Sequence, residues 1–153
     1  MPNPDDVKRI AKSTADYYDD HKGKPLADFV KRHWQSDVVI CQSGRPPYGM
    51  EQFLREHSPD SGMSWDATRM KTQKLVVGED SFVLYYHIVS WRTHEADHIA
   101  ASGENRKAGL EGYQTTVIPG ISIFTVGDSG KVARMDGFVF MPPDLVAKGA
   151  VVY

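Results

Sequence analysis

The spacing of apolar and polar side chains predicts helices in the first third of the chain. In residues 4–22 apolar positions recur at the i, i+3, i+4 spacing of one helix face, and acidic residues stand near its start. A second short apolar stripe covers residues 25–34. Residues 38–41 predict a brief strand, and residues 50–57 predict a third short helix. We therefore expect a mainly helical N-terminal part.

The rest of the chain has the pattern of β-strands, because β-branched and aromatic residues dominate it. Residues 65–77 and 81–93 flank a Gly-Glu-Asp turn and predict one hairpin. Residues 112–140 predict a longer hairpin that turns at Gly127-Asp128-Ser129-Gly130. In its first arm Pro119-Gly120 predicts a bulge or bend, since proline cannot donate to a ladder.

Two segments have no clear period. Residues 94–111 predict a long loop or a small helix, and residues 144–153 predict a short helix or an apolar arm that packs on this or another subunit. With helices first and a run of antiparallel strands after them, the order of elements predicts an α+β fold. We expect the helices to lie on one face of a curved antiparallel sheet.

Composition and charge narrow the class of protein. The 153 residues are 41% hydrophobic and 25% charged, which predicts one compact domain over residues 1–153. The net charge of -2 and the lack of a Lys or Arg run predict no nucleic-acid partner and no membrane partner. The lone Cys41 excludes an internal disulfide, and the N-terminus lacks the pattern of a secretory signal. We expect a cytoplasmic protein.

The order of elements resembles that of the NTF2-like superfamily. The strongest local match is ISIFTVGDSGKVARMDGF, residues 121–138: an apolar strand, a turn ending in Gly-Lys-Val, and a final strand. The superfamily includes SnoaL-type polyketide cyclases, ketosteroid isomerase, limonene epoxide hydrolase and scytalone dehydratase. The resemblance implies a cone-shaped sheet wrapped around N-terminal helices, with a deep apolar pocket. It also implies a homodimer through the convex face of the sheet.

The first predicted helix carries two candidate catalytic residues. Residues 15–20, Ala-Asp-Tyr-Tyr-Asp-Asp, resemble the region where scytalone dehydratase has an adjacent Tyr and Asp and ketosteroid isomerase has an oxyanion-hole tyrosine. The resemblance implies catalytic roles for Tyr18 and Asp19. Helical phase puts Tyr18 on the apolar face, where a phenol can donate to a carbonyl or enolate oxygen. Alternatively, Tyr18 is a core tyrosine and the aspartates are a solvated face.

A third candidate lies in the strand predicted for residues 81–93. Tyr86 and His87 resemble the Tyr-His pair of scytalone dehydratase, which implies that Tyr86 binds substrate and His87 is a general acid or base. Both phases of this strand are apolar, so the sequence leaves open which one faces the pocket. If Tyr86 faces inward, His87 lies under a dimer partner instead.

Departures from the family are also visible. The general-base aspartate of ketosteroid isomerase corresponds to a position near Gln42, and its protonated aspartic acid to one near Ser122. A steroid-isomerase mechanism of that type is therefore disfavoured, and the resemblance implies that Gln42 and Ser122 contact substrate. The second histidine of scytalone dehydratase has no counterpart in the strand from 113 to 126.

Other residues are candidates for the lining of a ligand pocket, and none of them predicts a cofactor site. Five aromatic residues can line a cavity for a lipophilic ligand: Trp34, Tyr48, Trp65, Phe138 and Phe140. His94 and His98 are spaced as metal ligands on a helix, but they lack a convincing third ligand and stand in a polar segment. We expect no metal and no cofactor.

These patterns lead to one functional hypothesis and two alternatives. The hypothesis is a cofactor-independent isomerase, cyclase or dehydratase that acts on a lipophilic polyketide- or terpenoid-like molecule. The first alternative is a binding or dimerisation module of the same fold, favoured by the missing carboxyl groups. The second is an epoxide hydrolase, for which Asp37 and Asp136 are the available carboxylates.

Overall fold

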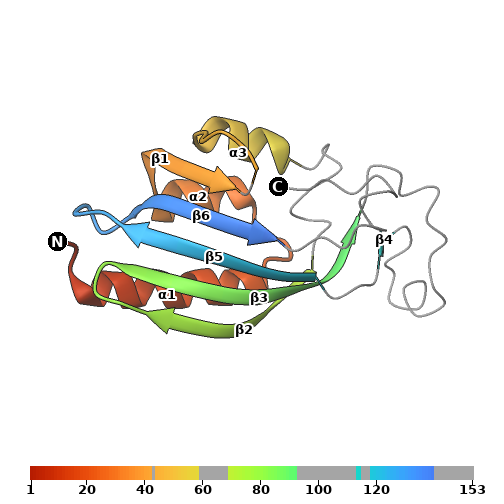
Figure 1. Ribbon diagram of the computed structural model, residues 1–153, viewed down its shortest axis with the longest axis horizontal. Helices are drawn as coiled ribbons and strands as arrows, with labels where there is room; N and C mark the ends of the chain where they lie inside the picture. The colour runs from red at the N-terminus through yellow and green to blue at the C-terminus, as the bar shows by residue number, and fades with distance from the viewer. Residues whose placement is uncertain (43, 59–68, 93–112, 115–117, 140–153) are drawn as a thin grey trace.

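The computed structural model describes residues 1–42, 44–58, 69–92, 113–114 and 118–139. Its helices and strands follow the expected order, with helices first and most strands after them (Figure 1). The elements are α1 (Pro4–Asp19), α2 (Leu26–His33), β1 (Trp34–Gln42), α3 (Met50–Glu56), β2 (Arg69–Val77), β3 (Ser81–Arg92), β4 (Tyr113–Gln114), β5 (Ile118–Val126) and β6 (Val132–Val139).

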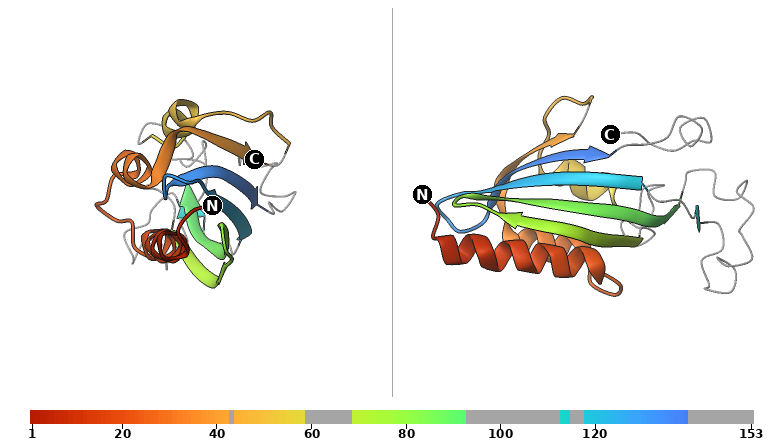
Figure 2. Two further views of the ribbon diagram at one scale, coloured as in Figure 1. Left: turned by 90° about the vertical axis from the view of Figure 1, so that its left-hand side faces the viewer. Right: turned by 60° about the horizontal axis from the view of Figure 1, so that its bottom comes forward.

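The strands form one curved sheet in the order β1-β6-β5-β3-β2, with β4 paired to β3. The α+β prediction is confirmed, with one difference: the sheet is mixed, because β1 runs parallel to β6 while the other pairs are antiparallel. In the described part of the chain β1 and β2 remain the two edges, so the sheet is open. α1 lies along one face of this sheet (Figure 2).

Helix α1 is specified by its ends and by one apolar face. Pro4 occupies its first turn, where the missing N–H costs nothing, and the Asn3 side chain accepts from the Asp5 N–H at 2.9 Å. Its buried face includes Val7 and Tyr18, as the sequence predicted. Tyr17 stacks on Phe29 of α2 at 4.0 Å between ring centroids, which ties the two helices together.

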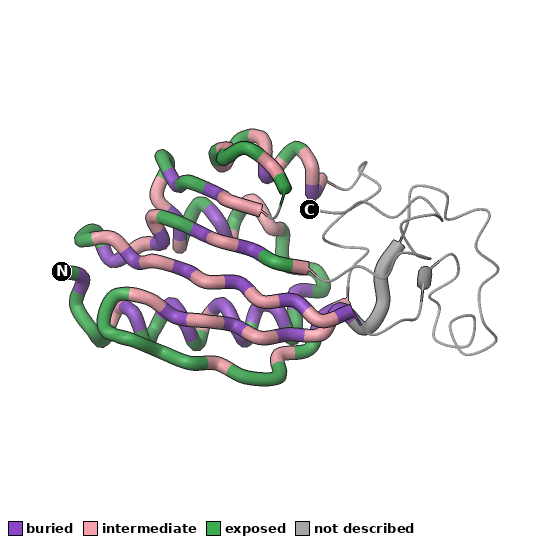
Figure 3. Tube along the Cα trace, in the orientation of Figure 1, coloured by how far each residue is buried: buried purple, intermediate pink, exposed green. Residues whose placement is uncertain are grey.

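Strand β3 shows which face of the sheet is covered. Phe82, Leu84, Tyr86 and Ile88 are buried, whereas the residues between them are only half-buried (Figure 3). We call the face that carries Tyr86 and packs on α1 the inner face, and the opposite one the outer face. The burial pattern thus shows that Tyr86 faces inward and His87 outward, which the sequence left open.

Two details of the predicted elements are wrong. Trp34 belongs to β1 and not to the second helix, because it pairs with Val132 in the sheet, and β1 therefore begins before the expected residue 38. Pro119-Gly120 forms no bulge: its pairing with β3 is continuous, and the register shift of β5 against β6 lies at Thr125/Val126 instead.

The other strand predictions hold where they can be compared. The turns at residues 78–80 and 127–130 join the expected strands. The predictions for residues 65–68, 94–111 and 144–153 lie outside the described residues. No helix in the described part of the chain combines the length and apolar character needed to cross a membrane.

Candidate functional site

Three hydroxyl groups meet on the inner face. Tyr18 comes from the last turn of α1, Tyr86 from β3 and Ser122 from β5, and all three are buried. The rings of Tyr18 and Tyr86 meet edge to face, with centroids 5.1 Å apart. Ser122 Oγ lies 3.5 Å from the Tyr86 hydroxyl and also hydrogen-bonds with Tyr18. We call these residues the hydroxyl cluster.

A glycine makes room for this cluster. Gly120 pairs with Tyr86 across β5 and β3, and a Cβ on Gly120 would lie 2.6 Å from Cζ of the Tyr86 ring. The ring therefore lies directly against the backbone of β5, which only glycine permits at this position. This close approach keeps Tyr86 beside Tyr18 and Ser122.

Burial keeps both phenols neutral. It raises the pKa of Tyr18 well above the ordinary value of 10.0, and the neighbouring Tyr86 raises it further. Burial also raises the pKa of Tyr86, against a smaller opposing effect of the hydrogen bond with Ser122. Neutral phenols at physiological pH are hydrogen-bond donors and not bases. Such donors can stabilise negative charge that develops on a ligand oxygen.

A row of paired residues leads from the hydroxyl cluster to the edge of the sheet. Leu84, Ser122, Gly137 and Gln42 are in register across β3, β5, β6 and β1, so all four positions share the inner face. Gly137 contributes no side chain. A Cβ on Gly137 would lie 3.2 Å from Met135 Sδ, so the Met135 side chain packs over Gly137 in this row, between Ser122 and the half-buried Gln42.

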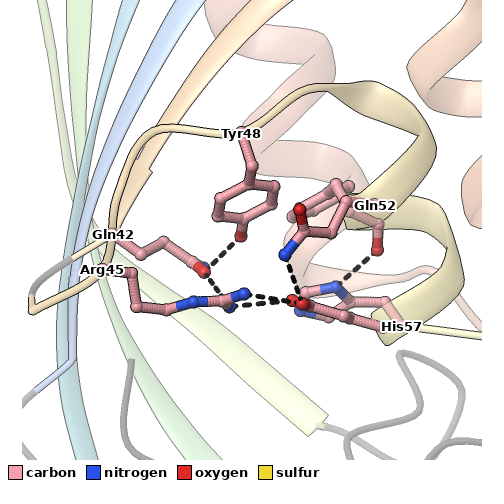
Figure 4. A network of polar contacts seen from close by, with 7 residues as sticks. Gln42, Arg45, Tyr48, Gln52 and His57 are labelled. Atoms are coloured by element: carbon pink, nitrogen blue, oxygen red, sulfur yellow. Dashed lines mark hydrogen bonds and ion pairs between the residues drawn. The ribbon is translucent and has the colours of Figure 1, made fainter.

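A polar network surrounds Gln42 and connects it to α3 (Figure 4). The Tyr48 hydroxyl donates to Gln42 Oε1, and Arg45 Nη1 donates to the same oxygen at 3.3 Å. Arg45 also forms a bidentate ion pair with Glu56, with N–O distances of 2.8 and 2.6 Å. Gln52 donates to Glu56 at 2.9 Å. This network fixes the loop after β1 on α3.

The network contains an acid and lies beside a buried imidazole. The hydrogen bond from Arg45 lowers the pKa of Glu56 to about 2. Burial lowers the pKa of His57, whose Nδ1 lies 2.9 Å from the Phe53 carbonyl oxygen. Because a carbonyl can only accept, Nδ1 carries the proton of the neutral ring and Nε2 carries the lone pair.

The pairing of Glu56 predicts a specific loss of stability in acid. The pKa of Glu56 in the folded protein is below the ordinary value of 4.5. The pair with Arg45 therefore contributes to the free energy of unfolding above that pH, and this contribution is lost as pH falls towards 2. In Glu56→Gln this contribution is absent at every pH. We expect the unfolding free energy of the wild type to fall more steeply than that of Glu56→Gln between pH 5 and 3, measured by urea titration. If the unfolding free energies of the two proteins fall in parallel with pH, the Arg45–Glu56 pair does not contribute to stability.

Two predicted catalytic residues lie away from the hydroxyl cluster. Asp19 is exposed at the end of α1, where its Oδ1 accepts from the Thr72 N–H on edge strand β2 at 2.5 Å. His87 lies on the outer face, where its Nε2 is 2.9 Å from the Tyr85 hydroxyl. Of the two phases that the sequence left open for β3, the one with Tyr86 inside is the buried one, so the alternative with His87 outside holds.

The predicted lining residues are dispersed. Trp34 is a core residue that packs against Phe53 and Phe124, with ring centroids 5.2 and 6.2 Å away. It also borders a surface depression of about 590 Å³ between α2, β1 and the β5–β6 turn. Phe138 is 40% exposed and pairs with Ile121 on the outer face. Trp65 and Phe140 lie outside the described residues.

Neither carboxylate considered for epoxide hydrolysis flanks the hydroxyl cluster. Asp136 is on the outer face, where Arg134 holds it by two bonds of 2.8 Å, and Asp37 is exposed. In the described ranges no three His, Cys, Asp or Glu side chains are grouped as a metal site would need. His94 and His98 lie outside these ranges.

Sequence reasoning missed the network on α3. Arg45 and Glu56 are 11 residues apart in the chain, a spacing that matches no helix or strand period. Only the fold of the loop brings them together. Arg45 lies between the predicted strand and the predicted third helix, and Glu56 and His57 stand at the end of that helix.

Comparison with solved structures confirms the NTF2-like fold. A protein from Jannaschia sp. CCS1 named as a SnoaL-like polyketide cyclase is 15% identical and has a TM-score of 0.62, over 93% of this chain and 90% of its own. One from Kribbella flavida named as a ketosteroid isomerase is 15% identical with a TM-score of 0.57, over 91% and 83%. Both activities are assignments that have not been confirmed.

The comparison also includes a designed protein. A de novo designed protein with a curved β-sheet is 12% identical and has a TM-score of 0.54, over 94% of this chain and 91% of its own. No protein-family model and no curated protein sequence matches the chain. The function therefore has to be argued from the residues of the site.

Proposed function

We propose, from the premise that this chain has the NTF2-like fold, that it is an acid/base enzyme acting on a lipophilic carbonyl compound. Isomerisation, cyclisation and dehydration of polyketide- or terpenoid-like molecules all belong to this class. Where such a reaction takes place next to a carbonyl group, it passes through an enol or enolate whose oxygen becomes more negative than the ground-state carbonyl oxygen. Donors placed at that oxygen accelerate the reaction without a cofactor.

The observation that carries the proposal is the hydroxyl cluster. Tyr18, Tyr86 and Ser122 converge from three elements, are buried, and include two phenols whose pKa burial raises. The other buried side chains of this face are apolar, among them Leu84, Phe124 and Met135. The common chemistry of the three hydroxyl groups is hydrogen-bond donation to one oxygen.

The proton carrier of the proposed reaction is a separate question. Asp19 and His87 are the weaker candidates, because one is exposed and the other is on the outer face. His57, at the end of α3, is a further candidate: it is 9% exposed, and burial lowers its pKa. A neutral imidazole with its lone pair on Nε2 is a competent base.

Enolisation can be tested before the natural substrate is known. The protein is incubated in D₂O with a panel of mono- and polycyclic ketones, and deuterium uptake next to the carbonyl is followed by NMR. Uptake above the buffer rate supports the proposal. If ketones bind with no uptake from any member of the panel, the non-catalytic binding module is the better description. That alternative is motivated by the absence of a carboxylate beside the cluster in the described residues.

The outer face supports a proposal about assembly. Val39, Val76 and Phe138 are 40%, 50% and 40% exposed, and Phe138 is in register with Ile121 and Tyr85. Exposed apolar residues on one face of a sheet can pack against a second copy about a two-fold axis. We propose that a second copy of the chain covers this face.

Charge at Phe138 should separate the two copies. We expect light scattering of the wild type to give about twice 17.1 kDa at micromolar concentration, and Phe138→Glu to give the single-chain mass. Phe138→Leu, which stays apolar, is the matched control and should remain paired. A wild type of single-chain mass would contradict the proposal.

A further inference from the structure

A depression lies at the end of the sheet where β1 begins. It has a volume of about 590 Å³ and is bordered by α2, the first residues of β1 and the turn between β5 and β6, which Figure 1 shows at one end of the sheet. Its lining consists of described residues and includes no member of the hydroxyl cluster. The depression is therefore a second candidate site, separate from the one in which we place the carbonyl chemistry.

Two lysines bring positive charge to this depression from different elements. Lys31 is exposed on the last turn of α2, and Lys131 is half-buried just before β6. Lys131 Nζ donates to the Lys31 carbonyl oxygen at 3.4 Å, which holds its ammonium group at the end of α2. Among the described residues, neither ammonium group has a carboxylate oxygen within 4.0 Å. The described part of the chain thus supplies no counter-ion for either lysine.

Two carboxylates near the β5–β6 turn are already paired. Asp6 Oδ1 binds Arg9 at 2.7 Å, and Asp128 binds the amino group of Met1 at 2.8 Å. Asp37 is the one carboxylate in the lining of the depression, and it is exposed. Two ammonium groups and one carboxylate leave the lining with an excess of positive charge.

A nearby imidazole responds to the same positive charge. Burial lowers the pKa of His33 at the end of α2, and positive charges around it lower the pKa further. These charges come from Arg32, Arg9 and Lys131. The basic character of this end of the molecule therefore extends beyond the two lysines of the lining.

The other groups of the lining suit an organic anion. Gln35 Nε2 donates to Ser129 Oγ at 2.7 Å, so the hydrogen of the Ser129 hydroxyl stays available for a ligand. Gln35 reaches Ser129 across Gly127, where any side chain would collide with the amide. Ser36 adds an exposed hydroxyl group, and the half-buried Met50 adds apolar surface. The lining can thus donate to an oxyanion and contact an apolar group beside it.

We propose that this depression binds a small amphipathic anion, an aryl or alkyl molecule with one carboxylate or phosphate group. The acid group lies between Lys31 and Lys131 and accepts from Ser129, while the apolar part lies against Met50. A lysine ammonium binds carboxylates and phosphates alike as a compact charge, so both belong to one ligand class. The proposal does not depend on the carbonyl chemistry of the hydroxyl cluster.

Four probes test the requirement for charge and for an apolar part. 2-Naphthoate and 2-naphthamide differ only in the acid group, 2-naphthyl phosphate carries the alternative acid, and inorganic phosphate lacks the apolar part. Dissociation constants are obtained by titrating each probe into isotope-labelled protein and following the amide resonances by NMR. At low salt the tighter of the two organic anions should bind at least about 5-fold more tightly than the amide, as one or two exposed ion pairs allow. Added salt should reduce this preference.

Charge variants locate the acid group. Lys31→Gln combined with Lys131→Gln should remove the preference for the acid, whereas Lys71→Gln, at an exposed position on β2, should keep it. Asp37→Asn should raise the affinity for the acid by about 2–5-fold, because it removes the one negative charge of the lining. Tighter binding cannot result from misfolding, and a melting curve checks the fold of the double lysine variant.

Several results would overturn the proposal. Equal affinities for the acids and the amide would do so, as would a preference that survives in the double lysine variant or an affinity that Asp37→Asn leaves unchanged. Failure of both organic anions to bind at millimolar concentration would also contradict it. If inorganic phosphate binds as tightly as 2-naphthyl phosphate, the apolar part contributes nothing and the amphipathic class of ligand is wrong.

Discussion

Replacing Tyr18 by phenylalanine is expected to lower the rate of enolisation by about 10²–10³-fold, the usual effect of removing one donor from an oxyanion site. The ring contact with Tyr86 at 5.1 Å remains, so only the hydroxyl is lost. The raised pKa of Tyr18 keeps the wild-type group protonated, and the ratio of rates should therefore be constant from pH 6 to 9. Deuterium uptake into the best ketone of the panel is the measurement.

The adjacent tyrosine provides a matched control. Tyr17 is also buried in α1, but its hydroxyl donates to the Lys24 carbonyl oxygen at 2.8 Å and its ring stacks on Phe29. Tyr17→Phe should lower the melting temperature slightly and leave the rate of uptake unchanged. If Tyr18→Phe exchanges deuterium at the wild-type rate, Tyr18 is a packing residue and the hydroxyl cluster is not the oxyanion site.

Adding one methyl group at Gly120 is expected to damage both stability and the site. A Cβ there would lie 2.6, 2.7 and 2.8 Å from Cζ, Cε2 and Oη of Tyr86, closer than side-chain atoms can pack. The Tyr86 ring is buried against Tyr18 and cannot move without displacing it. Gly120→Ala should lower the unfolding free energy by about 1–3 kcal/mol, as overpacking does, and weaken ketone binding. Urea denaturation and ligand-observed NMR measure the two effects.

A double-mutant cycle identifies the cause. In a Tyr86→Ala background the added methyl group meets no ring, so Gly120→Ala should cost much less there. Gly49→Ala is the control for the substitution itself, because the nearest atom to its Cβ is 4.0 Å away. Equal costs of Gly120→Ala in both backgrounds would show that Tyr86 is not the group with which the methyl collides.

The position of Tyr18 and the hairpin turns could be predicted from the sequence because each depends on local rules. The i, i+3, i+4 spacing puts Tyr18 on the buried face of α1, whatever the rest of the chain does. Gly, Asp and Ser between two β-rich runs predict the turn at residues 127–130, where Gly130 has a φ of 72°. Neither inference needs a contact between distant segments.

Other parts of the site could be read only from the tertiary structure. Both phases of β3 are apolar, so a shift of one residue would exchange Tyr86 with His87 at no local cost; contact with α1 decides that Tyr86 is inside. The pairing of Arg45 with Glu56 follows from how a loop returns onto α3. The parallel pairing of β1 with β6 joins residues about 95 positions apart, as Ile40 and Met135 show.

The sequence by itself thus determined the order and type of most elements, because hydrophobic period and turn chemistry act over a few residues. The tertiary structure alone decided which side chains share a face of the sheet, and so which of the candidate residues meet. Tyr86 and Ser122 are opposite Tyr18 because strands and helix pack in one register, and Gln42 shares a row with Ser122 through Gly137 of β6. Such registers depend on the burial of whole faces, which no short stretch of sequence specifies.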